Sequence, residues 1–331
     1  MSAVARWLGR VVPAIFLSGG VLAAAPVSAQ SDLDVVASIL PLHALAAAVS
    51  EGVGEPALLL EGGASPHSFS LRPSDARELA DAELVIWIGE DLELFLRRPL
   101  ETVAAKATVL TVSELEGITL LPVREAGLHS TAELAHDHDH DQDNDHDHDA
   151  GHDHDHAHGS YDPHLWLDPA NAQVIAAAIA ETLTEIDPAH AEQYRANAAA
   201  LQESLTELES DLRAQLEPLK GSSFLVFHDG YQYFEAAFDL PSAGALSLGP
   251  ERQPGAQRLK EIRAWVAQEE AVCLFSEPQF EPRIARVVVE GTDARLGELD
   301  PLGATLAPGP HAYEQLLRAL ADSLTECLTA D

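Results

Sequence analysis

The sequence has little positive charge and lacks a common motif of metal-dependent hydrolases. Its 331 residues contain 19 Lys and Arg against 54 Asp and Glu, which gives a formal net charge of −35 at pH 7. This surplus of negative charge makes nucleic acid an unexpected partner and favours cations. The motif HExxH is absent. Its absence argues against a hydrolase, because such an enzyme needs a general base beside the metal-bound water.

The sequence also lacks a good candidate for a membrane anchor. The apolar run VVPAIFLSGGVLAAA is interrupted by Pro13 and by two glycines, and it is shorter than the ~20 residues that a spanning helix needs. Two arginines precede the run and the small residues VSA follow it, so it predicts a signal peptide over residues 1–29, cleaved after Ala29. No Cys lies near this point, so we expect no lipid anchor. We therefore expect the mature chain to be exported to a periplasm and to be freely soluble there.

Cysteine is limited to two residues, Cys273 in the apolar run AVCLFSEP and Cys327 near the end of the last helical pattern. In an exported protein such a pair is best interpreted as one disulfide. For a loop of about 55 residues, the chain-entropy model gives roughly 4 kcal/mol of stabilisation. Two buried thiols or a cysteine metal site are the alternatives, and both fit an exported protein with two cysteines less well.

Strand-like runs alternate with helical patterns along the mature chain. The first half contains DVVASIL, PALLLEGG, AELVIWIGE and ATVLTVSE, and the alternation resumes at SSFLVFH in the second half. This order predicts an α/β protein with mostly parallel sheets flanked by helices. Because a mature chain of about 300 residues exceeds what one hydrophobic core usually serves, we expect two lobes.

A segment without glycine separates the two halves. From Pro188 to Leu216, leucines recur at spacings of three and four between positions 201 and 216. This pattern predicts one amphipathic helix of roughly 28 residues, about 40 Å long. The expected organisation is an N-terminal α/β lobe over residues 30–187, a linking helix over 188–217 and a C-terminal α/β lobe over 218–331.

One segment is dominated by two residue types. From position 136 to 158 the chain reads HDHDHDQDNDHDHDAGHDHDHAH, with nine His and nine Asp in 23 residues. Such a segment cannot bury a core and is expected to be disordered, but imidazoles at i and i+2 are transition-metal ligands. A merely solvated loop would not need the histidines, so we predict weak auxiliary zinc binding here. The residues concerned are His136, His138, His140, His146, His148, His152, His154, His156 and His158.

Outside this segment, a few side chains could form one metal site. His67 follows the run PALLLE, His228 ends SSFLVFH, and Asp300 ends ARLGELD, whereas His164 precedes a helix in YDPHLWLDP. Ligands of open α/β sheets bind at the carboxyl ends of strands, so a metal held by these residues would lie between the lobes. His43 also follows a strand-like run. Position alone therefore leaves four or five candidates for a site of three or four ligands.

Several segments carry a resemblance to a known family. They are GASPHSFSLRPSDARELADAELVIWIG, DPHLWLDP, FLVFHDGYQYF, FSEPQF and GELDPLG, together with the two cysteines, and they span Asp34 to Cys327. The chain resembles the ZnuA-type zinc-binding proteins, the periplasmic substrate-binding components of high-affinity zinc ABC importers, in the cluster A-I family that also holds manganese binders. The resemblance implies two α/β lobes bridged by one long helix, little hinge motion, and a non-enzymatic monomer that delivers zinc to an inner-membrane ABC permease.

The resemblance also implies a ligand set. His67, His164 and His228 match the family's three His ligands, and manganese-type relatives have an acidic residue at the third position, so His228 favours zinc. Asp300 matches an acidic ligand of several relatives. Some zinc binders place Glu before the first His, where this chain has Pro66. Either Asp300 or water must then complete the tetrahedron, and we expect Asp300. A His-rich insertion is typical of the zinc binders, with a suggested role in collecting or sensing metal.

Two other functions remain open at this point. Three His with an open fourth position also hold catalytic zinc, so a zinc hydrolase is the enzyme alternative. A metal-buffering protein or surface adhesin with the same fold is the other. An importer component differs from both because it must dock a membrane permease.

Overall fold

The computed structural model describes residues 33–124, 161–247, 255–268, 273–280 and 282–329. The expected signal peptide and the expected loop at 136–158, with its nine histidines, lie outside the described residues. Among the described helices, none combines the length and the apolar character needed to cross a membrane.

The N-terminal lobe contains a four-stranded parallel sheet in the order β2-β1-β3-β4. Its strands are β1 (Val35–Ala37), β2 (Ala57–Leu58), β3 (Leu84–Trp87) and β4 (Thr108–Thr111). Its helices are α1 (Leu40–Val49), α2 (Pro73–Asp81), α3 (Arg97–Thr102) and α4 (Pro169–Ile186). All four residues of β3 are buried, as expected for a parallel strand covered on both faces.

The C-terminal lobe repeats this plan with a parallel sheet in the order β6-β5-β7-β8. Its strands are β5 (Phe224–His228), β6 (Ala245–Ser247), β7 (Cys273–Ser276) and β8 (Arg295–Glu298). Its helices are α6 (Gln232–Phe238), α7 (Ala256–Gln268), α8 (Pro282–Val289) and α9 (Ala312–Thr329). The expected fold class, two α/β lobes with parallel sheets, is confirmed.

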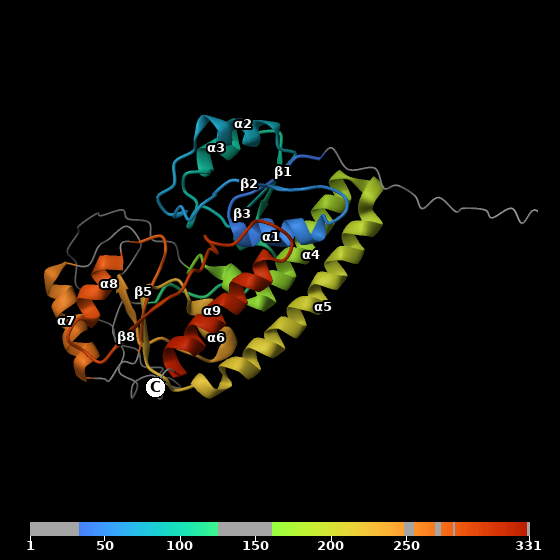
Figure 1. Ribbon diagram of the computed structural model, residues 1–331. Helices are drawn as coiled ribbons and strands as arrows, with labels where there is room; N and C mark the ends of the chain where they lie inside the picture. The colour runs from blue at the N-terminus through green and yellow to red at the C-terminus, as the bar shows by residue number, and fades with distance from the viewer. Residues whose placement is uncertain (1–32, 125–160, 248–254, 269–272, 281, 330–331) are drawn as a thin grey trace, which may run out of the picture.

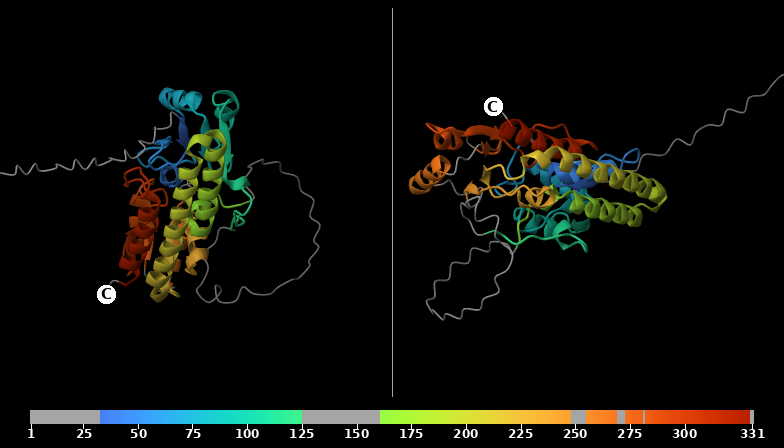
Figure 2. Two further views of the ribbon diagram at one scale, coloured as in Figure 1. Left: turned by 90° about the vertical axis from the view of Figure 1, so that its right-hand side faces the viewer. Right: turned by 90° about the horizontal axis from the view of Figure 1, so that it is seen from below.

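The long helix α5 (Ala191–Leu216) connects the two lobes (Figure 1). Its 26 residues correspond to about 39 Å at 1.5 Å per residue. The helix begins three residues later than the sequence pattern suggests, because 3-10 turn η3 (Pro188–His190) precedes it. It lies beside α4 in Figure 2 and also packs against α1 and α9. The expected linking helix is therefore present.

One main hydrophobic core runs through both lobes. It joins residues of β1, α1 and α4 to residues of α5, β5 and α9, and a smaller second cluster lies within the C-terminal lobe. Cys273 on β7 and Cys327 on α9 form a disulfide, which confirms the expected pairing. The disulfide ties the last helix to the sheet of the C-terminal lobe.

Candidate metal centre

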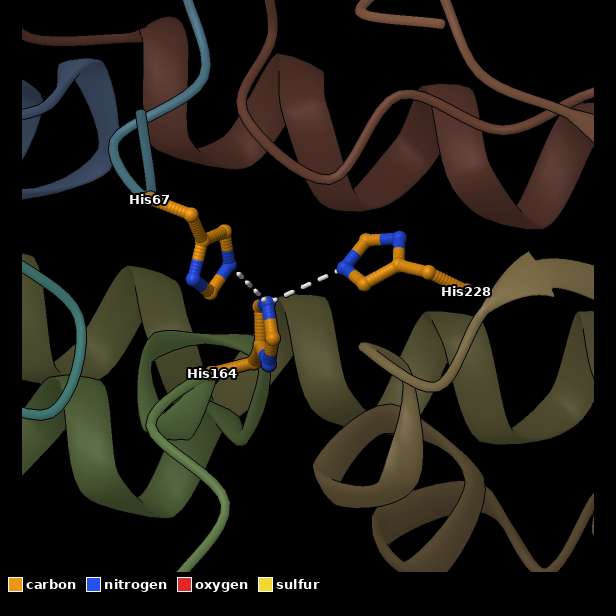
Figure 3. A group of neighbouring side chains, drawn as sticks. All are labelled: His67, His164 and His228. Atoms are coloured by element: carbon orange, nitrogen blue, oxygen red, sulfur yellow. Dashed lines mark hydrogen bonds between the residues drawn. The ribbon is translucent and has the colours of Figure 1, made fainter. Parts of the chain in front are cut away.

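Three histidines from three separate elements meet between the lobes (Figure 3). His67 lies in the loop between β2 and α2, His164 immediately precedes the 3-10 turn η2 (Leu165–Leu167), and His228 is the last residue of β5. In the described part of the chain they are the one group of three or more His, Cys, Asp or Glu whose ligand atoms lie within 4.8 Å of one another. The structure therefore brings together the three predicted His ligands.

The spacing of the facing nitrogens matches a zinc site. The Nε2 atom of His164 lies 3.4 Å from Nε2 of His67 and 3.1 Å from Nε2 of His228. In a tetrahedral zinc site with Zn–N bonds of about 2.0–2.1 Å, two ligand nitrogens are about 3.3 Å apart. The two contacts, drawn as dashed lines in Figure 3, therefore have the length of the edges of such a tetrahedron.

Local sequence places two of these ligands. The 3-10 turn η2 directly follows His164, and the carboxylate of Asp168 then accepts the N–H of Ala170 at 2.8 Å and caps α4, whose first residue is Pro169. On the other side, Gly230 follows β5. A Cβ atom at position 230 would lie 2.4 Å from Nε2 of His228. Glycine is thus required there for the close approach of the backbone to the ligand.

Two buried carboxylates orient the imidazoles. Asp162 Oδ1 lies 2.7 Å from Nδ1 of His164, and Glu277 Oε1 lies 2.5 Å from Nδ1 of His228. The same carboxylate oxygens accept the backbone N–H groups of the two histidines, at 3.0 and 3.2 Å. In the neutral ring, each Nδ1–H therefore donates a hydrogen bond to a carboxylate, and this tautomer presents an unprotonated Nε2 to a metal.

This tautomer makes the site a receptor for a cation. When both rings are neutral and both Nδ1 atoms act as donors, Nε2 of His164 and Nε2 of His228 point their lone pairs at one another across 3.1 Å. Such lone pairs repel, and a cation between them converts the repulsion into attraction. Phe280 lies beside His228 and Trp166 lies beside His164, with ring centroids 5.5 and 5.3 Å apart. These apolar walls strengthen the electrostatic interactions inside the site.

The protonation of the site follows from the same contacts. Burial acts to raise the pKa of Asp162. The electrostatic attraction to His164 and the hydrogen bonds from His164 outweigh burial, so the pKa of Asp162 lies below its usual value. Burial acts to lower the pKa of His228, but the charge of Glu277 outweighs it and the pKa is raised. Burial first, and then the charges of His164 and His228, hold the pKa of His67 well below its usual value. His67 is therefore neutral and ready to bind metal at pH 7.

Asp300 has a different role in the structure from the one expected of it. Its Oδ1 accepts from Gln279 Nε2 at 2.9 Å, and its two oxygens accept three backbone N–H groups of residues 302–304, at 2.5 to 3.2 Å. The carboxylate does not belong to the group formed by the three histidines among the described residues. An Asp before Pro is a turn former, and Asp300 stabilises the turn that follows it. Because these contacts occupy the Asp300 carboxylate, water competes with the expected Asp300 for the fourth position of the zinc site.

His43, the other candidate left open by position, lies outside the site. It is buried on α1, and its Nε2 is 3.0 Å from the carbonyl oxygen of Pro56. A hydrogen bond to a backbone carbonyl is a structural role. His43 is therefore an internal control for the ligands, since its imidazole is buried like theirs.

The two orienting carboxylates were not predicted from the sequence. Asp162 stands two residues before His164, and a carboxylate so close to a ligand His is a signal that could have identified it. Glu277 lies 49 residues from its partner His228, and no local pattern links them. Only the pairing of β5 with β7 brings Glu277 to the site.

Comparisons with known proteins show the family of the chain. The family model of ZnuA, the periplasmic zinc-uptake complex component A, matches residues 35–327. The chain is 48% identical over 309 residues to the high-affinity zinc uptake system protein ZnuA of Brucella suis biovar 1, with 89% of this chain and 91% of that protein covered. It is 40% identical over 323 residues to the protein of the same name from Yersinia pestis, with 98% of each chain covered.

Solved structures show the same fold. A crystal structure of ZnuA superimposes with a TM-score of 0.72 at 25% identity, over 90% of this chain and 99% of that chain. The laminin-binding protein Lmb of Streptococcus agalactiae, described as a bifunctional protein with adhesin and metal-transporting activity, gives a TM-score of 0.71 at 26% identity. Its match covers 90% of this chain and 100% of that chain.

Proposed function

Since this chain belongs to the ZnuA family of periplasmic zinc-uptake components, we propose that it captures Zn²⁺ between its lobes and delivers it to an ABC-type importer of the inner membrane. Zinc is then the cargo of the protein. The proposal includes export by the signal peptide over residues 1–29, a periplasmic location and a monomeric chain.

The observation that carries the proposal is the cluster of three Nε2 atoms on His67, His164 and His228. All three donors are imidazole nitrogens, which suit zinc better than manganese. Two of the rings are fixed by carboxylates from different lobes, Asp162 and Glu277. Because Asp300 already accepts four hydrogen bonds, we infer that water completes the coordination.

The same geometry favours a carrier over a hydrolase. A zinc hydrolase requires a carboxylate or imidazole free to take a proton from the metal-bound water. Here Asp162 and Glu277 are each hydrogen-bonded to the Nδ1 atom of a ligand. Their contacts support a role in fixing the ligands, and we propose that the protein has no enzymatic activity.

An adhesin activity is the second candidate, because Lmb combines adhesion with metal transport on this fold. The two candidates differ in their partner. Binding of the purified chain to immobilised laminin would support adhesion. Restored growth of a zinc-starved strain that lacks its own zinc-binding component would support transport.

Replacing single histidines tests the proposed ligands. Alanine at position 67, 164 or 228 should weaken zinc binding by more than about 100-fold. This loss exceeds the one that is typical when a residue hydrogen-bonded to a metal ligand is replaced. His43→Ala is a matched control, because His43 is 6% exposed, close to the 5% of His164 and the 4% of His228. Zinc competition titration with a chromophoric chelator measures the effect. An equal loss in His43→Ala would refute the ligand assignment.

A further inference from the structure

An arginine of the N-terminal lobe crosses to the C-terminal lobe next to the metal centre. Arg124 donates through Nε to Oδ2 of Asp229 at 3.1 Å and through Nη2 to Oδ1 of the same carboxylate. Through Nη1 it donates to Oε2 of Glu235 at 2.7 Å. One guanidinium thus bridges two carboxylates in the bidentate geometry that only Arg provides.

Both carboxylates lie at elements that support the site. Asp229 immediately follows the ligand His228, and Glu235 lies on α6. The side chain of Glu235 is 5% exposed, and its Oε2 also accepts the N–H of Ser242 at 3.1 Å. A carboxylate so deeply buried requires a cation partner. Burial acts to lower the pKa of Arg124, but Glu235 and Asp229 outweigh it and raise the pKa, so the guanidinium stays charged.

The residues just before Arg124 are paired with the segment that contains Asp162, the carboxylate that orients His164. The N–H of Asp162 donates to the carbonyl of Leu121 at 2.8 Å, and Pro122 pairs with Tyr161 in an antiparallel bridge. We call residues 121–124 together with 161–162 the stem. In sequence the stem flanks residues 125–160, which lie outside the described part of the chain.

The stem contacts α6 at a second point besides Arg124. The hydroxyl of Tyr233 accepts the N–H of Leu121 at 2.9 Å and donates to the carbonyl oxygen of Asp162 at 2.8 Å. The stem is therefore held on the C-terminal lobe by a neutral side chain at one end and by an ion-pair cluster at the other. Its position fixes Asp162 relative to the loop that contains His228.

We propose that Arg124 is a positioning residue for the zinc site, which aligns His164 of one lobe with His228 of the other through the stem and Asp229. The inference rests on the proposed zinc ligands. Arg124 itself contacts none of them in the hydrogen bonds described above. Its removal leaves the buried Glu235 without its cation and releases one end of the stem.

The test compares Arg124→Gln with Arg318→Gln in the full mature chain. Arg318 is a matched control, because it also bridges two carboxylates, Glu314 at 3.0 Å and Asp211 at 3.1 Å, on α9 and α5. Arg124→Gln should lower zinc affinity about tenfold, whereas Arg318→Gln should leave it unchanged. Arg124→Lys keeps the charge without the fork and should restore only part of the loss.

Two further readouts distinguish positioning from a general loss of stability. The visible absorption of bound Co²⁺ reports tetrahedral geometry and should weaken in Arg124→Gln while remaining unchanged in Arg318→Gln. In a double-mutant cycle, Asp229→Asn combined with Arg124→Gln should lose less affinity than the sum of the two single losses. Strictly additive losses, or an unaltered cobalt spectrum, would overturn the proposal.

Measuring His164→Ala in the same series distinguishes a failure of the ligand assignment from a failure of the proposal for Arg124. If His164→Ala binds zinc like the wild-type chain, the ligand assignment fails and the proposal for Arg124 fails with it. If His164→Ala loses zinc but Arg124→Gln retains wild-type affinity, only the proposal for Arg124 is refuted.

Discussion

Each of the two best-buried ligands uses one ring nitrogen for a carboxylate and presents the other to the metal. The Nδ1 atom of His164 is hydrogen-bonded to Asp162, and the Nδ1 atom of His228 is hydrogen-bonded to Glu277. These hydrogen bonds fix the tautomer and the ring orientation before zinc arrives, so little reorganisation is needed on binding. His67 is more exposed than the other two, and burial and the neighbouring imidazoles keep it neutral.

Glu277→Gln tests whether the carboxylate supports His228 as a ligand. The amide keeps the shape of the side chain but loses the charge that favours Nδ1–H on His228, so zinc affinity should fall about 10- to 100-fold. The control is Glu298→Gln, an exposed position on the neighbouring strand β8. Zinc competition titration of both variants decides, and wild-type affinity in Glu277→Gln would show that the carboxylate does not support the ligand.

At the same scale, Asp300 shows what the sequence could and could not reveal. His67, His164 and His228 could be identified because each stands in a motif of the resemblance, and because His67 follows a strand and His228 ends one. A carboxylate in the motif GELDPLG has the same sequence whether it binds a metal or stabilises a turn. The choice depends on where the N–H groups of residues 302–304 point, and only the folded chain determines their direction.

Among the elements, the end of the N-terminal sheet contains a buried carboxylate that the zinc site does not use. Glu93 is fully buried, and its Oε2 accepts the N–H groups of Ile88 and Gly89, just after β3, at 2.7 and 3.3 Å. Burial raises its pKa to about 7, although nearby hydrogen-bond donors oppose the shift. The folded protein therefore favours the protonated form of this side chain.

This pKa predicts how stability depends on pH. Between the usual Glu pKa of 4.5 and the folded-state pKa of about 7, the folded state binds more protons than the unfolded state, so the free energy of unfolding decreases as pH rises. The contribution of Glu93 is present below this window, and about 3 kcal/mol is lost above it. Glu93→Gln should therefore be more stable than the wild-type chain at pH 8 and nearly equal to it at pH 4.5.

Urea unfolding of the wild-type chain, Glu93→Gln and the exposed control Glu90→Gln at the two pH values measures this effect. The difference between variants isolates Glu93 from the other titrating groups. A stability difference between the wild-type chain and Glu93→Gln that does not change with pH would contradict the prediction.

The strands and helices themselves were largely predictable, because parallel strands buried on both faces appear as short apolar runs such as LVIW in β3. The start of α5 was not predictable, because Pro188 fits both a 3-10 turn and the first turn of an α-helix.

The segment rich in His and Asp gives a separate prediction. Deleting residues 137–156 should lower the number of zinc ions bound while one tight site remains, because ligands in a segment of this composition are expected to bind at the cost of their ordering entropy.

Isothermal titration calorimetry of the deletion variant tests this prediction. The wild-type chain should show one tight class of sites and an additional weak class, and the variant only the tight class. Loss of the tight class on deletion would mean that histidines of the segment are primary ligands.

On the scale of the whole molecule, the two lobes are tied together around the site. Trp166 donates from Nε1 to the carbonyl oxygen of Pro301 at 2.9 Å, and Tyr313 on α9 donates to the carbonyl oxygen of Trp166 at 2.7 Å. Helices α1 and α9 pack against each other, and the main core continues across the lobes. We infer that zinc binds without a large hinge motion, as the resemblance implies, and that the proposed delivery to a permease would require local displacement of ligands.

Anomalous diffraction at the zinc absorption edge, from crystals of the mature chain loaded with one equivalent of zinc, locates the bound ion. We expect one strong peak at about 2.0–2.1 Å from the Nε2 atoms of His67, His164 and His228, with water in the fourth position and the Asp300 carboxylate still on residues 302–304. A carboxylate of Asp300 within bonding distance would instead restore the original His₃Asp expectation. A peak elsewhere, or one that contacts fewer than three of these histidines, would contradict the account.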